Sequence, residues 1–504
     1  MFDGERPLLD SDSIDEFSGN MASIRVLPMQ RDVSTAHHKR NSKGEFTGRF
    51  HNPWPSWRGL SLKDAYESYM DGATLKPPPE AGENESPEKN GRMVKVRRPE
   101  WEQKPQNGEE LEKSRAKVCW LGHAGTFVQL PWPDREGAKG VRENEGVGIL
   151  FDPIFSKRCS PVQWFGPARN LPPPCRVAEL PRIHICLISH DHYDHLDYNT
   201  IMELYRTNSE HIHFFVPLGV KKWFISCKIP AHQVVELDWH QEALVKIPRS
   251  VSSYSDNGYP PRASMATESD DEAAPLTGGA GDGDHYDDQH FGKYANGAAL
   301  TLKVICTPAQ HRSGRGIFDH FSSLWSSWVV GVVNRGDNED DPFEDEALED
   351  RDSERRFRPE DGFRMYFAGD TGFRYAGAPK QESHLAMCPA FQEIADRYGP
   401  MDFCCLPIST GSSLSFLRSI LGISLNHYKL TSTQHLNSWD AIQISKVMGS
   451  KASLAVHHST FSPEDESRGN LWEFRRTTES ENVSTEWGER GCFKVSDVGE
   501  VLYL

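Results

Sequence analysis

The feature that most constrains this chain is a run of metal-ligand side chains that follows an apolar segment. Residues 183–188 are apolar, and the six residues 190–195 then carry three imidazoles and two carboxylates. Alternation along an extended segment sends His190 and His192 to one side. The turn that follows, predicted to open a helix, presents Asp194 and His195 together. Two ligand pairs aimed at neighbouring points are what a two-metal site needs. A polar loop with surface histidines is disfavoured, because the preceding strand is apolar and the ligand types suit zinc.

The form His-x-His-x-Asp-His over residues 190–195 resembles the metallo-β-lactamase superfamily. The resemblance implies an α/β fold of four layers, an αββα sandwich, with the metal site at one edge of the two sheets. It also implies three further ligands downstream, namely a later histidine, a bridging aspartate and a last histidine.

Composition excludes several classes of protein. The 504 residues carry a net charge of −17, which argues against binding nucleic acid through its phosphates. No apolar run approaches the roughly 18 residues of a transmembrane helix. The acidic residues 1–16 lack a signal-peptide core, so we expect a cytoplasmic protein. The ten cysteines contain no CxxC pair, which is typical of reduced thiols.

Composition also divides the chain. Residues 1–112 are predicted to be a largely disordered extension, because they hold too few apolar residues to offset the entropy of ordering. Within them, the aromatic stretch 46–57 is predicted to dock on the body of the domain. Residues 113–504 are predicted to form one metallo-β-lactamase-like domain. The low-complexity segments 250–297 and 334–361 are predicted to be flexible insertions.

Within the domain, apolar runs alternate with helix-like segments, which predicts α/β layering. Helices are expected at 219–227 and 437–448. Strands are expected at 118–121, 126–130, 147–151, 183–188, 213–217, 233–237, 299–306, 324–330, 364–368 and 453–456. His123, in the turn between the first two strands, is expected either to lie near the metals or to fix that turn.

Three later residues complete the expected metal site. His311, Asp370 and His457 each follow an apolar strand, and loops at one sheet edge collect functional groups in layered α/β folds. His190, His192 and His311 would hold one zinc; Asp194, His195 and His457 would hold the other; Asp370 would bridge them. Two Zn²⁺ would supply a bridging hydroxide at neutral pH. Iron or manganese would suit the same ligand types.

A narrower resemblance rests on several motifs together. The chain is similar to the N-acylphosphatidylethanolamine-hydrolysing phospholipase D family over residues 46–240, 299–333 and 363–460, through the stretches 50–57, 120–124, 188–198, 215–219, 307–311 and 367–372. The resemblance implies a zinc-dependent phosphodiesterase that releases phosphatidic acid and an N-acylethanolamine. It also implies a further active-site histidine 22 positions before the last ligand, here His435, for phosphate contact or protonation of the leaving group. A surface histidine ahead of a helix is the alternative.

Two stretches depart from the family. Pro407-Ile408 continues into Ser409–Ser413, and His457 is followed by His458-Ser459 where Trp-Gly is common. The metal site is expected to be intact, but the pocket beside it is expected to differ. A lactonase, another phosphodiesterase or an inactive zinc-binding membrane scaffold therefore remain as alternatives.

The implied substrate is a phospholipid, so we expect peripheral association with a membrane surface. The stretches 416–421 and 92–98 are the candidate contact surfaces, and a core helix is the alternative for the first. A homodimer is compatible with the sequence, and no nucleic-acid partner is expected.

Overall fold

The computed structural model describes residues 21–59, 61–71, 93–101, 116–133, 146–249, 299–316, 318–333, 356–358, 361–376, 387–409, 416 and 427–504. The predicted insertion 250–297 lies outside the described residues. So does the predicted insertion 334–361, except for residues 356–358 and Asp361.

Two β-sheets form the centre of the molecule. The larger has eight strands in the order β1 (Ser23–Val26), β10 (Glu242–Ile247), β11 (Leu300–Thr307), β12 (Ser327–Val332), β13 (Arg364–Phe367), β14 (Phe403–Pro407), β15 (Ala452–Val456) and β16 (Cys492–Lys494). Strands β13 to β16 run parallel to one another, whereas the pairs from β1 to β13 are antiparallel.

The smaller sheet has seven strands in the order β17 (Val501–Tyr503), β4 (Lys117–Gly122), β5 (Gly125–Pro131), β6 (Gly146–Phe151), β7 (Ile185–Leu187), β8 (His213–Pro217) and β9 (Val234–Leu237). Strands β6 to β9 run parallel. A separate hairpin pairs β2 (His38–Arg40) with β3 (Phe46–Phe50).

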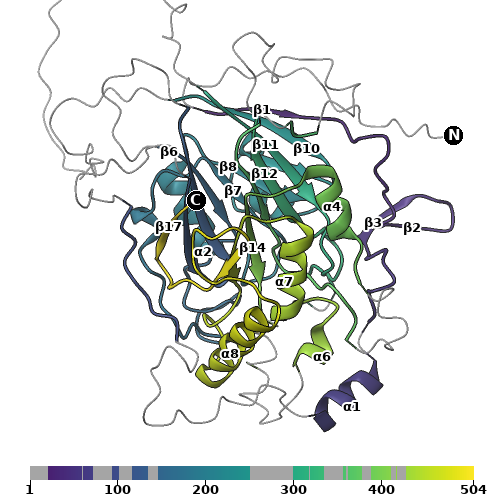
Figure 1. Ribbon diagram of the computed structural model, residues 1–504. Coiled ribbons are helices and arrows are strands. Elements are labelled where there is room, and N and C mark those ends of the chain that lie inside the picture. The colour runs from purple at the N-terminus through teal and green to yellow at the C-terminus, as the bar shows by residue number, and fades with distance from the viewer. Residues whose placement is uncertain are drawn as a thin grey trace, which may run out of the picture.

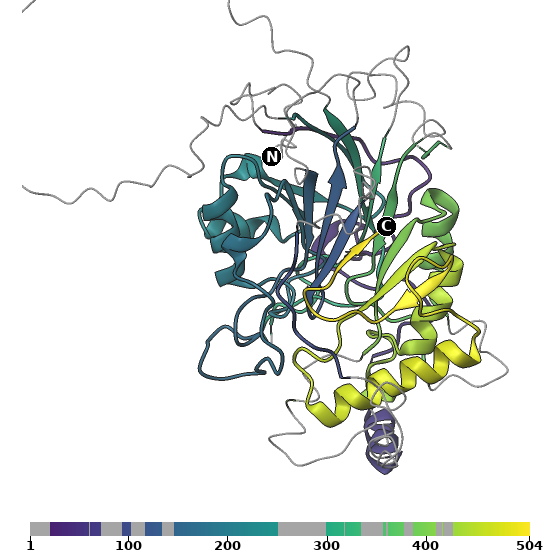
Figure 2. The same cartoon turned by 60° about the vertical axis from the view of Figure 1, so that its left-hand side comes forward.

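Helices cover both outer faces, so the molecule has four layers (Figures 1 and 2). The larger sheet is covered by α4 (Ala390–Tyr398), α7 (Ser438–Val447) and α8 (Glu464–Ser480), which share one apolar cluster with it. The smaller sheet is covered by α2 (Tyr198–Asn208) and α3 (Lys221–Ser226). The main core lies between the sheets, where side chains such as Trp120, Phe151 and Trp328 are buried. The predicted αββα sandwich is confirmed.

Helix α1 (Leu62–Asp71) contacts α6 (His427–Thr431), and single 3₁₀ turns occupy Val177–Glu179 and Ala231–Gln233. The helix predicted at 219–227 is α3 and that at 437–448 is α7. The strand predicted at 324–330 begins later, at Ser327, because Leu324 and Trp325 belong to a buried loop.

The N-terminal region contributes to the body of the domain. Ser23–Val26 pairs with β10 and extends the larger sheet. In the docking stretch, Phe50 is buried and Trp54 stacks on Trp239 with ring centroids 5.2 Å apart. The expectation of a largely disordered extension does not hold for these residues, whose order comes from pairing with distant parts of the chain.

Two observations concern membrane-spanning helices and the state of the cysteines. In the described part of the chain, no helix is both long enough and apolar enough to cross a membrane. All ten cysteines are free thiols, and eight of them are buried.

Candidate metal centre

The side chains singled out in the sequence gather at one edge of the sandwich. His190–His195 follow β7, His311 follows β11, Asp370 follows β13 and His457 follows β15. Parallel strands bring their carboxyl ends to one edge, and β13 and β15 lie on either side of β14 in this orientation. The topology therefore brings residues from both halves of the chain together.

A first group contains His190, His192 and His311, whose ring nitrogens lie within 4.8 Å of one another. His192 Nδ1 lies 2.9 Å from His190 Nε2 and 3.3 Å from His311 Nε2. His190 and His192 thus face the same point, as alternation predicted.

A second group contains Asp194, His195 and His457, and His123 joins it. His123 Nε2 lies 3.1 Å from Asp194 Oδ2, and the rings of His123 and His457 are 4.1 Å apart. Asp194 and His195 lie in a turn, because α2 begins only at Tyr198. The helix therefore opens after the ligand pair rather than at it.

Asp370 lies between the two groups. Its Oδ1 is 3.0 Å from His457 Nε2, and its Oδ2 is 3.3 Å from His195 Nε2 and 3.8 Å from His311 Nε2. One carboxylate thus faces both groups, which is the arrangement of a bridging ligand.

The backbone around Asp370 needs glycine. Gly369 has φ +58°, and a Cβ on it would lie 2.6 Å from Ser189 Cβ. A side chain at this position would separate the Asp370 turn from the segment that carries His190. Asp152, His123 and His457 also have positive φ, at 39°, 52° and 61°. Non-glycine residues adopt this conformation at a cost, and it concentrates at functional sites.

Hydrogen bonds orient the histidines. Asp152 Oδ2 lies 2.7 Å from His195 Nδ1, and Asp152 Oδ1 accepts from the backbone N–H of Ser189 at 2.7 Å. Ser189 Oγ lies 2.9 Å from His190 Nδ1, and the carbonyl oxygen of Gln434 lies 3.0 Å from His311 Nδ1. Such partners turn the other ring nitrogen of each histidine toward a metal.

Burial keeps most of these imidazoles neutral. It lowers the pKa of His190 and of His311 well below the usual value and lowers the pKa of His123 to about 3. His195 is different. Burial alone would lower its pKa, but the carboxylates of Asp370, Asp194 and Asp152 together raise it well above the usual value. The centre thus concentrates negative charge around a buried imidazole.

The donor set fits a cation. His195 Nε2, His457 Nε2 and Asp370 Oδ1 are buried and have no hydrogen-bond partner among the described residues, although they face one another. Buried polar atoms normally have partners. Imidazole nitrogens and carboxylate oxygens that converge on one point are suited to hold a metal. Asp194 and Asp370 supply the compensating negative charge.

Two further residues lie beside the cluster. His435 Nδ1 is 3.7 Å from Asp370 Oδ2, and its side chain is only 15% exposed, so it is not a surface histidine. Arg312 follows His311 and is half-buried, and its Nε has no hydrogen-bond partner in the described part of the chain. Burial chiefly lowers the pKa of His192 and of His311, and the positive charge of Arg312 lowers both further.

The sequence did not decide whether His123 lies near the metals or only fixes a turn, and it gave Asp152 no role. The Asp-Pro pair at 152–153 is typical of a strand that leads into a loop, so the role of the Asp152 carboxylate, which contacts His195, was not predicted. Its position at the end of a buried parallel strand, like those of Asp370 and His457, was the available signal.

Of the segment Ser409–Ser413, which departs from the family, only Ser409 is described, and its Oγ accepts from Asn470 Nδ2 at 3.2 Å. His458 is buried against Trp120, with ring centroids 4.4 Å apart.

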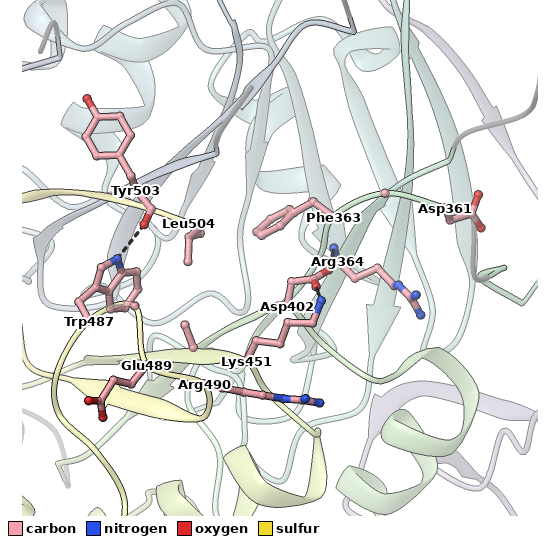
Figure 3. A pocket seen from close by; sticks show the side chains of 13 residues that line it. Asp361, Phe363, Arg364, Asp402, Lys451, Trp487, Glu489, Arg490, Tyr503 and Leu504 are labelled. Carbon is pink, nitrogen blue, oxygen red and sulfur yellow. Dashed lines mark hydrogen bonds and ion pairs between the residues drawn. The ribbon is translucent and has the colours of Figure 1, made fainter. Parts of the chain in front are cut away.

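A cavity of about 750 Å³ lies elsewhere (Figure 3). It opens between the starts of β13 and β15 and the end of β17, with Phe363, Lys451 and Trp487 among its lining residues. The metal-ligand candidates follow the opposite ends of β13 and β15. The cavity is therefore not part of the candidate centre.

Comparison with known proteins agrees with this geometry. Residues 148–266 match the model of the beta-lactamase superfamily domain. Together with the αββα layers, the match shows similarity to the metallo-β-lactamase superfamily and supports a metal-dependent hydrolase. The chain is also similar to proteins described as N-acylphosphatidylethanolamine-hydrolysing phospholipases D.

Two relatives carry that name. The chain is 27% identical over 348 residues to N-acyl-phosphatidylethanolamine-hydrolyzing phospholipase D 1 of Caenorhabditis elegans, covering 68% of this chain and 64% of the relative. It is 22% identical over 474 residues to the mitochondrial protein of the same description from Saccharomyces cerevisiae, covering 88% and 77%.

Other similar proteins align with this chain over different shares of their length. An uncharacterized Mycobacterium tuberculosis protein is 28% identical over 297 residues, covering 59% of this chain and 50% of that protein. The chain thus spans less than two thirds of the nematode and mycobacterial relatives. Among solved structures, the metallo hydrolase Igni18 from Ignicoccus hospitalis aligns at a TM-score of 0.37 and 15% identity, covering 77% of this chain and 98% of the other.

Proposed function

We propose that this chain is a zinc-dependent phosphodiesterase of the phospholipase D type. Its proposed reaction hydrolyses N-acylphosphatidylethanolamine to phosphatidic acid and an N-acylethanolamine. The observation that carries the proposal is the pair of ligand groups joined by Asp370, which faces His457 with one oxygen and His195 and His311 with the other. The names of the nematode and yeast relatives support the choice of substrate.

Each group has a proposed ion. His190, His192 and His311 would hold one zinc, and Asp194, His195 and His457 would hold the other, with Asp370 shared. When bound, two zinc ions supply a nucleophile at neutral pH and stabilise charge on phosphoryl oxygens. Asp152 and Ser189 hydrogen-bond to His195 and His190 and would keep these rings turned toward bound ions.

Arg312 supports an anionic substrate. It directly follows the proposed ligand His311, and its buried Nε has no hydrogen-bond partner among the described residues. Arginine binds phosphoryl oxygens through paired N–H donors. A phosphodiester carries the matching negative charge, whereas a lactone does not. We therefore favour the phosphodiester over the lactone.

His435 is proposed to bind the phosphoryl group. Burial lowers its pKa to about 4, so the imidazole is neutral at pH 7 and can donate one N–H hydrogen bond. A phosphodiester anion beside the ring would raise that pKa, because negative charge favours the imidazolium. Phosphate contact is thus its first role, and proton transfer to the departing alcohol oxygen depends on the bound anion.

A substrate panel tests the proposal. Purified protein is assayed against N-acylphosphatidylethanolamine, a lactone and a soluble phosphodiester, and turnover of the first should exceed the other two. Hydrolysis in ¹⁸O-labelled water should place the label in phosphatidic acid, because the water oxygen attacks phosphorus. Label in the N-acylethanolamine would mean attack at carbon and would rule out the proposed reaction.

Two substitutions test the proposed roles of His435 and Arg312 separately. His435→Ala should lower kcat by roughly 10²–10³-fold while the metal content is unchanged. Arg312→Ala should raise KM for the phosphodiester by roughly tenfold or more, and Arg312→Lys should restore part of the loss. Equal losses on the phosphodiester and on an uncharged ester would contradict the role given to Arg312.

A further inference from the structure

The docking stretch 46–57 reaches the loop that carries His311. Asn52 is buried and donates a hydrogen bond from Nδ2 to the backbone oxygen of His311 at 2.7 Å. Ser56 is fully buried and donates from its hydroxyl to Gln310 Oε1. The aromatic contacts already described would suffice to clamp the stretch to the domain. These polar contacts instead end at a proposed metal ligand and at the residue before it, so the stretch belongs to the surroundings of the candidate metal centre.

Gln310 connects the docking stretch to a segment that lies 123 residues further along the chain. Its side chain is buried, and its Nε2 donates to the backbone oxygen of Thr433 at 3.0 Å. A carbonyl oxygen can only accept, so the amide nitrogen of Gln310 must face Thr433 and the amide oxygen must face Ser56. The Ser56 hydroxyl supplies the donor that this amide oxygen needs. Ser56 thus helps to fix one orientation of the Gln310 amide.

Thr433 directly precedes two residues that reach the candidate centre. The backbone oxygen of Gln434 faces His311 Nδ1 at 3.0 Å, and His435 Nδ1 lies 3.7 Å from Asp370 Oδ2. The rings of His311 and His435 are 5.2 Å apart. The peptide group between Thr433 and Gln434 therefore influences where the Gln434 oxygen and the His435 ring are placed.

The backbone of Gln310 also holds the loop that follows Asp370. Its N–H donates to Thr371 Oγ1 at 2.9 Å, and its carbonyl oxygen accepts from the N–H of Gly372 at 2.8 Å. A Cβ on Gly372 would overlap the backbone of Thr433, so these two segments approach as closely as glycine allows. Gln310 thus joins the docking stretch, the loop after β13 and the segment that carries His435.

Both ends of the segment that carries His435 are held by other contacts. Asp440, in α7, is fully buried and accepts from Arg374 Nε at 2.7 Å and from Tyr428 Oη at 2.6 Å. The stretch 416–421, predicted as a membrane contact, precedes this segment and lies outside the described residues except for Phe416. Because Tyr428 and Asp440 are fixed in this way, loss of the Gln310 contact should displace the middle of the segment without unfolding it.

We infer that Gln310 is a positioning residue for His435, and that Ser56 of the docking stretch holds the Gln310 amide in the required orientation. The inference rests on the proposed function, because it assigns both residues to the step in which His435 contacts the phosphoryl group. Gln310 acts through the backbone of Thr433. A displacement of a reacting group by about 1 Å costs about a hundredfold in rate. The N-terminal stretch is therefore required for the reaction as well as for the fold.

A double-mutant cycle with Gln310→Met and His435→Ala tests the inference on whichever member of the substrate panel is turned over. In the metal-loaded full chain, Gln310→Met should lower kcat by about tenfold or more, because methionine cannot donate to the oxygen of Thr433. In the His435→Ala background the same change should cost less than about twofold, because the residue that Gln310 positions is absent. Ser56→Ala should lower kcat by about threefold to tenfold.

Gln233→Met is the matched control. Gln233 is also buried, and its Nε2 donates to the backbone oxygens of Ser209 and Ile212 at 2.7 and 3.1 Å. It directly precedes β9, at the opposite end of the parallel strands from the candidate centre. Gln233→Met should lower the melting temperature, as Gln310→Met does, and leave kcat unchanged.

Hydrogen exchange in the metal-loaded protein gives a measurement that does not depend on the substrate. The N–H groups of Gln434 and His435 donate to the backbone oxygen of Thr431 at 2.7 and 2.8 Å. Ser56→Ala and Gln310→Met should each speed exchange in a peptide that covers residues 431–437. Gln233→Met should leave exchange in that peptide unchanged.

Four results decide the inference. Equal losses of kcat with and without His435 would overturn it, as would wild-type kcat in a folded Gln310→Met variant that keeps its metal. Loss of metal from both Gln310→Met and Ser56→Ala would also overturn it, because the effect would then pass through His311. Unchanged exchange in residues 431–437 would overturn it whatever substrate the protein hydrolyses. A non-additive cycle on another substrate, without hydrolysis of N-acylphosphatidylethanolamine, would reject the proposed function and retain the positioning role.

Discussion

Two buried clusters of histidine and aspartate among the described residues differ in how their carboxylates are satisfied. In the candidate metal centre, His195 Nε2, His457 Nε2 and Asp370 Oδ1 face one another without hydrogen-bond partners in the described part of the chain. In the second cluster, His37 Nε2 and His38 Nε2 lie 2.7 and 2.8 Å from the two oxygens of Asp238. Asp238 Oδ1 also accepts from the backbone N–H of Trp239 at 2.8 Å.

This difference distinguishes a set of metal ligands from a contact that ties two parts of the chain together. Asp238 has one histidine nitrogen near each oxygen, and its Oδ1 is hydrogen-bonded, whereas Asp370 Oδ1 is not; His38 Nε2 makes no hydrogen bond among the described residues. Its two histidines belong to the N-terminal hairpin, and the carboxylate belongs to the body after β9. We therefore interpret the second cluster as a latch that ties the N-terminal region to the domain. Residue types alone are the same in both places.

The largest expected effect is that of Asp370→Asn. The shared carboxylate faces both groups, so its loss should reduce the metal content from about two ions per chain to below one. Turnover should fall by about a thousandfold or more, equivalent to about 4 kcal/mol in the activation barrier. Elemental analysis and steady-state kinetics provide the measurements. Asp238→Asn is the control and should keep its metal, and a preparation that is active without any metal would contradict the expectation.

A smaller effect is expected from Asp152→Asn. This carboxylate contacts His195 Nδ1 but is not one of the proposed ligands. Loss of such a partner lowers metal affinity by about 10–100-fold. Competition with a chelator measures the affinity. An unchanged affinity in the folded variant would show that Asp152 does not orient His195.

Asp238→Asn should change stability and leave metal binding alone. Asparagine carries no charge and has only one acceptor oxygen, so one of the two histidines loses its acceptor, and the free energy of unfolding should fall by about 2–4 kcal/mol. Urea unfolding of wild type and variant at equal metal content gives the difference. A loss of metal from this variant would mean that the two clusters are not independent.

The smallest effect is the response of this latch to acid. Burial alone would raise the pKa of Asp238, but hydrogen bonds from His37 and His38 hold that pKa below its usual range. A depressed carboxyl pKa stabilises the fold above the unfolded value of about 3.9 and loses that contribution as the pH falls through the folded value. The difference in stability between wild type and Asp238→Asn should therefore be full above about pH 4 and shrink below it. A difference that grows in acid would contradict this sign.

Local pattern predicted the sandwich and the cluster because the relevant residues follow apolar strands. Periodicity located the core strands, and the parallel part of each sheet brings strand ends to one edge, so His311, Asp370 and His457 could be placed before any geometry was known. Asp152 stands at the same kind of position. It was missed because Asp-Pro is also an ordinary loop signal.

The N-terminal elements could not be predicted in this way. Ser23–Val26 is short and contains few apolar residues, and its order comes from β10, more than 200 residues away. Helix α1 has an apolar face, yet that face is turned outward by contacts with Tyr375 and Lys429. Neither partner can be identified from local sequence. Contacts with distant parts of the chain therefore determine the order of β1 and the orientation of α1.

The position of β1 also has a consequence for handling the protein. β10 is a six-residue strand that is buried along most of its length, and β1 occupies its free side through the register Ser23–Lys246 to Val26–Ala243. A chain shortened to begin at residue 113 would uncover that row of backbone donors and acceptors. Bare edge strands recruit other strands and initiate aggregation. Strand β1 thus acts as a built-in cover for the sheet, and versions that lack it should precipitate where the full chain stays dispersed.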